Sequence, residues 1–279
     1  MSTLSTGFKP EISQTTTIGL LLLGGALAAS WVGINLAFPG LAPTGIPSAV
    51  LRLGIHIAIL TGLWLGLART EFPVSQRINI WLGVAVPFTL WLAVAWNLAI
   101  NDFFKPSLTG FPMLPIAIFA PVIIGLFVLL RSKSIASVLD ATPAAWLIAL
   151  QVYRIFGGIF IVNWVNGTAA AAFAWPAGVG DMLTGIMALP VAWQLASGAE
   201  NGPRAAIAWN IFGLLDFTIA ITMGTLTTPG PFQILGLDIP ASLGTYPTVL
   251  VPVFAVPSSI LLHALSIWQL RRISRWQEK

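Results

Sequence analysis

Eight long apolar segments run through the sequence, separated by short connections rich in polar residues, proline and glycine. Each segment is close to the ~20 residues that an α-helix needs to cross roughly 30 Å of hydrocarbon. Their approximate limits are 17–38, 48–68, 79–100, 111–130, 143–164, 169–196, 205–226 and 246–270. The pattern predicts an all-α fold: a polytopic membrane bundle of eight transmembrane helices, forming one domain over residues 17–270.

Prolines inside these segments predict that several of the helices are bent. Proline removes a backbone hydrogen bond, and membrane helices tolerate it because neighbouring groups bind the freed carbonyl. Pro176 lies within segment 169–196, which we expect to be broken or bent there. Pro252 and Pro257 lie near the start of the last segment and predict a second bend.

Basic residues in the connections predict how the bundle is oriented. If eight helices alternate in direction, all but one of the basic residues outside the segments fall on one side, and only Lys105 falls on the other. By the positive-inside rule this side is cytoplasmic. We therefore expect a cytoplasmic tail over residues 1–16, a basic cytoplasmic tail over 271–279, and a plasma or inner membrane location. The basic residues of the cytoplasmic side are Lys9, Arg69, Arg77, Arg131, Lys133, Arg204, Arg271, Arg272, Arg275 and Lys279.

Composition supports the membrane assignment and excludes several classes of protein. The chain is 57% hydrophobic and 8% charged, with a mean hydropathy of +0.89, far more apolar than a soluble domain. A sequence pI near 10.0 could indicate nucleic-acid binding, but the cations lie in short connections between apolar segments, so we expect the lipid bilayer and no nucleic acid as partner. The pattern predicts no oligomeric state.

Charged residues deep within the apolar segments are the strongest functional signal. Arg154 lies about eleven residues before the turn that joins two segments, and Asp181 about thirteen after it. In a helical hairpin they reach similar depths, roughly 16 to 20 Å from that turn. Asp216 also lies near the middle of its segment. Ionisable residues at such depth usually pair or line a wet cavity, so these three are our candidate substrate or proton site.

Polar and small residues at helical spacing extend this candidate site. Gly178 and Gly185 flank Asp181 at i−3 and i+4, where a second helix could approach closely. We also assign His263 to the site as a fourth ionisable residue, with Ser259 and Ser266 as its expected hydrogen-bond partners. The other supporting residues are Gln151 and Gly213, which share faces with Arg154 and Asp216, and Asn210, which could hydrogen-bond across helices. Helical spacing also places Gly158 on the face of Gln151 and Arg154.

Each of these residues also has a purely structural interpretation. A buried Arg154–Asp181 pair can hold helices together without any transport or chemistry. His263 can be a packing residue with satisfied hydrogen bonds. Arg52 and His56 lie near the outer end of their segment, where we expect Arg52 to extend towards lipid headgroups.

The sequence argues against bound cofactors and metals. It has no cysteine and only two histidines, too few for a structural zinc site, and no H-E-x-x-H helix or phosphate-binding glycine loop. Every lysine lies in a connection or tail, so none can carry retinal within the bundle. We therefore expect no cofactor and no metal.

Three functions remain open. The favoured one is a proton-coupled secondary carrier of a small solute. In it, Arg154 attracts an anionic group or alternates with an acid, and Asp181 or Asp216 takes up a proton. The second is an intramembrane enzyme acting on a lipid or isoprenoid, with an aspartate and His263 as acid and base. The third is a non-catalytic assembly or sensing subunit. Whether the protein is an enzyme stays open at this point.

Overall fold

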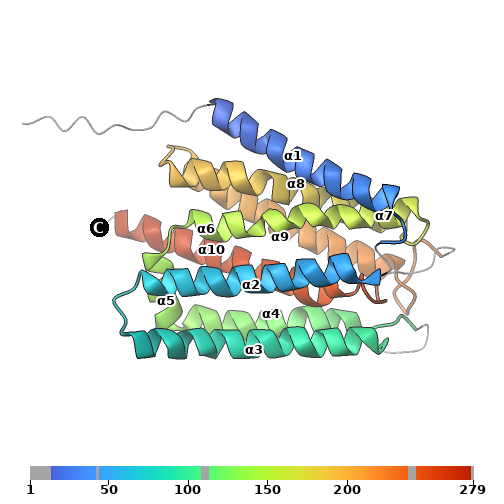
Figure 1. The fold of residues 1–279 in the computed structure, drawn as a ribbon, viewed down its shortest axis with the longest axis horizontal. Coiled ribbons are helices and arrows are strands. Elements are labelled where there is room, and N and C mark those ends of the chain that lie inside the picture. Colours follow the sequence, from blue (N-terminus) through green and yellow to red (C-terminus); the bar gives the residue numbers. More distant parts are fainter. Residues whose placement is uncertain (1–13, 42–43, 108–112, 238–242, 278–279) are drawn as a thin grey trace, which may run out of the picture.

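The computed structural model describes residues 14–41, 44–107, 113–237 and 243–277, and all regular structure within them is helical (Figure 1). Eight helical segments are long and apolar enough to cross a membrane, as predicted. Six of them are single helices: α1 (Gln14–Ala37), α2 (Ile46–Ala68), α3 (Val74–Ile100), α4 (Met113–Arg131), α8 (Ala171–Ala196) and α9 (Gly202–Thr227).

The remaining two segments are composite. In one, α6 (Ala145–Ala149) continues through the 3₁₀ helix η2 (Leu150–Gly158) into α7 (Ile159–Val165). In the other, one turn of π-helix, η3 (Val251–Ala255), leads into α10 (Val256–Gln277). Both non-α stretches lie inside the bundle, where such winding often marks a functional site.

The eight segments alternate in direction, so the bundle has two distinct ends (Figure 1). The first and last described residues lie at the same end, which we call the terminal end. The opposite end carries the connections from α1 to α2, α3 to α4, α7 to α8 and α9 to η3, and we call it the far end. Lys9, Lys279 and most of the expected N-terminal tail lie outside the described residues.

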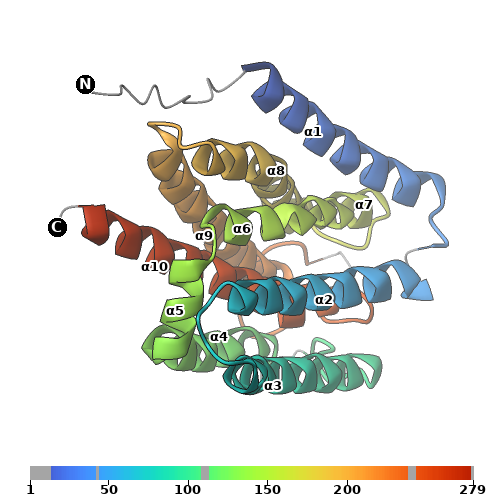
Figure 2. The same ribbon diagram turned by 60° about the vertical axis from the view of Figure 1, so that its left-hand side comes forward.

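The helices pack around α8. It lies against α9, α1 and the α6–η2–α7 segment, while α10 lies between α4 and α9. Figure 2 shows α1 at the edge of the bundle, apart from α2, with the α6–η2–α7 segment between the two. Segments far apart in the sequence therefore meet at the centre of the bundle.

A short helix at the terminal end was not predicted. This helix, α5 (Lys133–Ala141), begins at Ser132, whose Oγ accepts a hydrogen bond from the backbone N–H of Ile135 at 3.2 Å. It buries one apolar face against the bundle. The sequence pattern did not reveal it because it is much shorter than the apolar segments that were sought. The expected tail over 271–279 is also largely helical, since α10 continues to Gln277.

Prolines have different effects in the two segments where bends were predicted. Helix α8 is not broken at Pro176, because α-helical structure runs from Ala171 to Ala196. Irregular winding occurs at η3, which contains Pro252 and ends two residues before Pro257. In a regular helix the carbonyl of Val253 would bond the N–H four residues later, but proline has none. The Trp91 indole N–H donates to this carbonyl instead, at 3.1 Å.

Glycine allows the closest contact between α8 and η2. A Cβ on Gly185 would collide with backbone atoms of Ile155 and Arg154. Changing Gly185 to alanine should therefore lower the free energy of unfolding by about 1–3 kcal/mol, the usual cost of overpacking. Gly19→Ala, in α1, is the matched control, because no atom lies within 4 Å of the point that its added Cβ would occupy. Denaturant unfolding in mixed micelles measures the unfolding free energy of each variant. If the two variants were equally stable, the close packing of α8 against η2 at Gly185 would be contradicted.

Candidate functional site

The 3₁₀ winding of η2 determines which residues face the centre of the bundle. With three residues per turn, side chains three apart lie directly above one another. Gln151, Arg154 and Gly157 therefore share one face, and all three are buried. The prediction from α-helical spacing placed Gly158 on this face instead; Gly158 lies against Val32 and Met182.

Arg154 is the centre of the site and binds both candidate aspartates. Its Nε donates to Asp181 Oδ1 at 2.7 Å, and its Nη2 donates to Asp216 Oδ2 at 2.5 Å. Nη1 donates to the carbonyl oxygen of Gly213 at 3.4 Å and lies 2.9 Å from His263 Nε2. The Arg154 side chain is only 2% exposed, so this is a buried ion-pair network that joins η2, α8, α9 and α10.

The contact with Arg154 fixes the tautomer of His263. Arginine has only N–H donors, so His263 Nε2 must accept and Nδ1 must carry the hydrogen. Nδ1 then donates to Asn210 Oδ1, 2.9 Å away. The Asn210 amide nitrogen in turn donates to the carbonyl of Ala206 at 2.8 Å and to Ser266 Oγ at 3.0 Å. His263 is therefore neutral. We call these five side chains, Arg154, Asp181, Asp216, His263 and Asn210, the Arg154 cluster.

Aromatic rings separate the cluster from its surroundings. The guanidinium carbon of Arg154 lies 3.9 Å from the ring centre of Phe217, a cation–π contact. The Trp209 ring lies 4.8 Å from the His263 ring, and its indole N–H donates to the carbonyl of Thr184 at 2.9 Å. Apolar walls of this kind lower the local dielectric and strengthen the charge interactions inside.

Glycines make room for the charged side chains. A Cβ on Gly157 would collide with Asp181, and one on Gly180 would collide with Asp216. A Cβ on Gly213 would collide with His263 and Arg154. The sequence pattern selected Gly213 but missed Gly157 and Gly180, because their role depends on which helix faces them. Gly178, also selected, lies against Ile161 and not against the cluster.

Several predicted partners lie elsewhere. Ser259 does not bind His263; its Oγ lies 2.7 Å from the Tyr153 hydroxyl. Ser266 reaches His263 only through Asn210. Both amide atoms of Gln151 are buried without a hydrogen-bond partner among the described residues.

The cluster has a formal charge of −1 when both aspartates are ionised. One arginine and two carboxylates give this sum, to which the neutral His263 adds nothing, and a proton on either aspartate would cancel it. A further buried charge is Arg52 on α2, which forms no salt bridge with Asp181 within the described residues. Including Arg52, the charges in this region sum to zero. Among the described residues, no group of three or more His, Cys, Asp or Glu side chains is placed to hold a metal ion.

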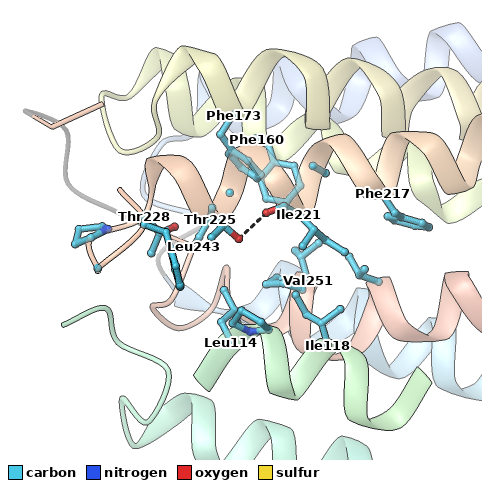
Figure 3. Close-up of a pocket in the computed structure, with 18 of the residues that line it drawn as sticks. Leu114, Ile118, Phe160, Phe173, Phe217, Ile221, Thr225, Thr228, Leu243 and Val251 are labelled. Carbon is cyan, nitrogen blue, oxygen red and sulfur yellow. Dashed lines mark hydrogen bonds between the residues drawn. The ribbon is translucent and has the colours of Figure 1, made fainter. Parts of the chain in front are cut away.

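An apolar cavity of about 100 Å³ reaches the cluster from the far end. Figure 3 shows its walls: Phe160 and Phe173 on one side, Leu114 and Ile118 of α4 on the other, with Ile221 and Thr225 of α9 beside them. Asp181 is the ionisable residue in its lining. One carboxylate oxygen, Oδ1, binds Arg154, whereas Oδ2 makes no hydrogen bond with any described residue.

Comparison with known proteins places this architecture in a family. Residues 111–271, more than half of the chain, match the family described as Domain of unknown function (DUF8737). The chain belongs to this family. No curated protein and no solved structure matches it. The segment matched to DUF8737 contains the entire Arg154 cluster and every residue that lines the apolar cavity, whereas α1, α2 and α3 precede it.

Removing the central arginine tests the network directly. In Arg154→Gln, two buried carboxylates lose their counter-charge, and breaking a buried pair costs about 3–5 kcal/mol of stability. The matched control is Arg272→Gln, which removes the partly exposed pair with Asp140 and should cost about 0–1 kcal/mol.

Neutralising both aspartates should restore part of the lost stability. The triple variant with Arg154→Gln, Asp181→Asn and Asp216→Asn no longer holds two buried carboxylates without their arginine, so it should unfold at higher denaturant concentration than Arg154→Gln alone. If Arg154→Gln is no less stable than Arg272→Gln, the buried network does not exist as described.

Proposed function

We propose that the protein is a proton-coupled secondary carrier that crosses the membrane eight times. Eight apolar helical segments of sufficient length support the crossing number. The concentration of basic residues at the terminal end supports a cytoplasmic location for both termini, in a plasma or inner membrane. At the far end of the described chain, Lys105 is the basic residue of a connection, and it pairs with Asp102 at 3.4 Å.

The observation that carries the proposal is the position of Asp181. Its Oδ1 belongs to the buried Arg154 cluster, and its carboxylate also faces the apolar cavity. A ligand in the cavity would contact the same Asp181 carboxylate that can take up a proton. Burial favours the neutral form of a carboxyl group unless a cation compensates, so displacing Arg154 from Asp181 would favour protonation. This is the physical basis of coupling.

The lining of the cavity indicates the class of substrate. Its walls are aromatic and aliphatic, which suits a molecule with considerable apolar surface and not a strongly hydrated solute. Helices α4 and α9 form two of its walls, and Val251 of η3 also lines it (Figure 3). We infer an apolar or amphipathic substrate that reaches the cavity from the far half of the bilayer.

The packing of the terminal half supports a carrier whose central site is reached from only one side of the membrane at a time. Apolar residues of α6, α8, α9 and α10 form a continuous core there, between the cluster and the terminal end; they include Ile148, Ala188, Ala206 and Leu270. The apolar cavity and a second cavity, beside α1 and α2, both lie in the far half. A carrier closed towards the cytoplasm would have this arrangement, and its transport cycle would require the terminal half to open.

An intramembrane enzyme is the second candidate, and the apolar cavity is what favours it. An acid at the end of a pocket for apolar molecules could protonate or deprotonate a lipid or isoprenoid held there. Since His263 is neutral and bonded to Arg154 and Asn210, Asp181 would be the reacting acid in this case. The fully paired Arg154 also suits the third alternative, a non-catalytic membrane subunit.

Orientation can be tested in the native background, because the chain has no cysteine. Lys105 at the far end and Glu200 at the terminal end are both exposed and can be changed to cysteine singly. In intact cells, a membrane-impermeant maleimide should label Lys105→Cys at once and Glu200→Cys only after permeabilisation. The reverse pattern would show that the termini lie outside.

Coupling can be tested in proteoliposomes that contain a trapped pH-sensitive dye. The added probes are tetraphenylphosphonium, farnesol and a farnesyl carboxylate, which share apolar surface and differ in charge. At least one probe should drive proton movement across the membrane, and Asp181→Asn should abolish this movement while the protein remains folded. Thr222→Ala, an exposed change elsewhere on α9, is the control.

The outcomes separate the three functions. Unchanged flux and coupling in both Asp181→Asn and Asp216→Asn would contradict the carrier. Chemical conversion of a membrane-extracted lipid without proton movement would identify the enzyme. Effects on protein abundance alone would identify the non-catalytic subunit.

A further inference from the structure

A second cavity of about 250 Å³ lies at the far end, between α1, α2, α7 and the chain that precedes η3. Unlike the first cavity, it is lined by many polar side chains, among them Asn35, Arg52 and Asn163. Val251 lines both cavities, so the two are neighbours. No residue of the Arg154 cluster lines this second cavity, which we call the Arg52 cavity.

Arg52 is a buried cation that lacks a direct partner among the described residues. We expected it to extend to the membrane surface, but the side chain is folded into the bundle and the residue is only 6% exposed. It forms no salt bridge with any residue that the structure describes, and its Nε has no hydrogen-bond partner there. A buried charge without a direct hydrogen-bonding partner is costly, so an anion bound beside Arg52 would stabilise it.

Two asparagines of the same cavity also have unused polar atoms. Asn163 is 9% exposed, and its amide nitrogen has no partner among the described residues. Asn35 is fully buried; its amide nitrogen donates to the carbonyl of Trp31 at 2.8 Å, which leaves Oδ1 as an unused acceptor. Buried polar groups are normally paired, so three unpaired groups around one cavity point to a missing ligand.

The unused atoms define the chemistry of this ligand. The Arg52 guanidinium and the Asn163 amide are donors and require an anion with several acceptor oxygens. Asn35 Oδ1 requires a donor, which a carboxylate lacks. A singly protonated phosphate provides both acceptor oxygens and one O–H, and its geometry matches the arginine fork. We propose that the Arg52 cavity binds a phosphate or phosphate monoester group.

Two sources could provide this group: a phosphate-bearing lipid or a free phosphate compound. The Arg52 cavity is lined in part by α1, which lies at the edge of the bundle (Figure 2). A lipid phosphate would approach the cavity along this edge. The proposal requires binding only, so it stands whether or not the protein is a carrier.

Binding at Arg52 would also act on the Arg154 cluster. The positive charge of Arg52 offsets the −1 of the cluster, and an anion bound to Arg52 would remove that offset. Protonation of Asp181 or Asp216 would then restore neutrality. If the proposed carrier function holds, phosphate binding and proton uptake should therefore favour each other.

The test uses the full chain in nanodiscs of phosphatidylcholine. In one arm, radiolabelled inorganic phosphate is titrated and measured by scintillation proximity; in the other, phosphatidic acid is included in the nanodisc and its retention is measured by native mass spectrometry. At least one probe should bind, and Arg52→Gln should weaken its binding on the order of tenfold or more. Arg69→Gln, an exposed change at the end of the same helix, should leave binding unchanged.

A second variant keeps the test decisive if Arg52→Gln fails to fold. Asn163→Asp preserves side-chain size and places a carboxylate in the cavity, where it can pair with Arg52 and repel phosphate. It should abolish binding while its melting temperature equals or exceeds that of the wild type. Inorganic phosphate binding indicates a free ligand, and retention of phosphatidic acid alone indicates a lipid. Absence of binding by both probes, or equal binding by all variants, overturns the proposal.

Discussion

The structure depends on a single arginine that must be satisfied inside an apolar bundle. Arg154 has five N–H donors and no access to water, so the surrounding helices must supply acceptors. Its partners come from α8, α9 and α10, which fixes how these three helices lie against η2. The positions of these helices are therefore set by the hydrogen bonds to Arg154 as well as by the packing of apolar surfaces. Glycines beside the charged side chains allow the helices to approach one another closely.

The class of fold could be predicted because the bilayer limits the length of an apolar helix. Eight runs of about twenty residues leave little choice, and the alternation of direction follows from short connections. The depth of Arg154 and Asp181 in a hairpin could also be counted, and the two side chains do form an ion pair. Local spacing is sufficient for such inferences, because the residues involved are close in the sequence.

What the sequence did not reveal depends on contacts between distant segments. The 3₁₀ winding of η2 replaces Gly158 by Gly157 on the face towards Asp181, and no local pattern predicts that winding. His263 was expected to bond to Ser259 and Ser266; it lies instead 2.9 Å from Arg154 Nη1, a contact that depends on how distant helices pack. Arg52 was expected at the surface, but it is only 6% exposed and lines a cavity together with residues of α1 and of the chain before η3.

Two cavities of opposite character adjoin the same buried charges. The apolar cavity meets the Arg154 cluster at Asp181, and the polar cavity holds Arg52, whose charge offsets that of the cluster. Occupancy of either cavity would therefore change the electrostatic balance at the two aspartates, without any need for a chain of conformational changes between distant sites. Carrier, enzyme and sensor would each use this balance differently, but all require the network around Arg154 to be intact.

The most direct test of that network is the protonation of His263, measured by ¹⁵N NMR of the labelled protein in lipid. The chain has only two histidines, and a His56→Gln variant would assign the signal. The account predicts a neutral ring at neutral pH, protonated on Nδ1, with Nε2 accepting a hydrogen bond from Arg154. A doubly protonated ring, or a ring protonated on Nε2, would contradict it, because Arg154 could not then donate to that nitrogen.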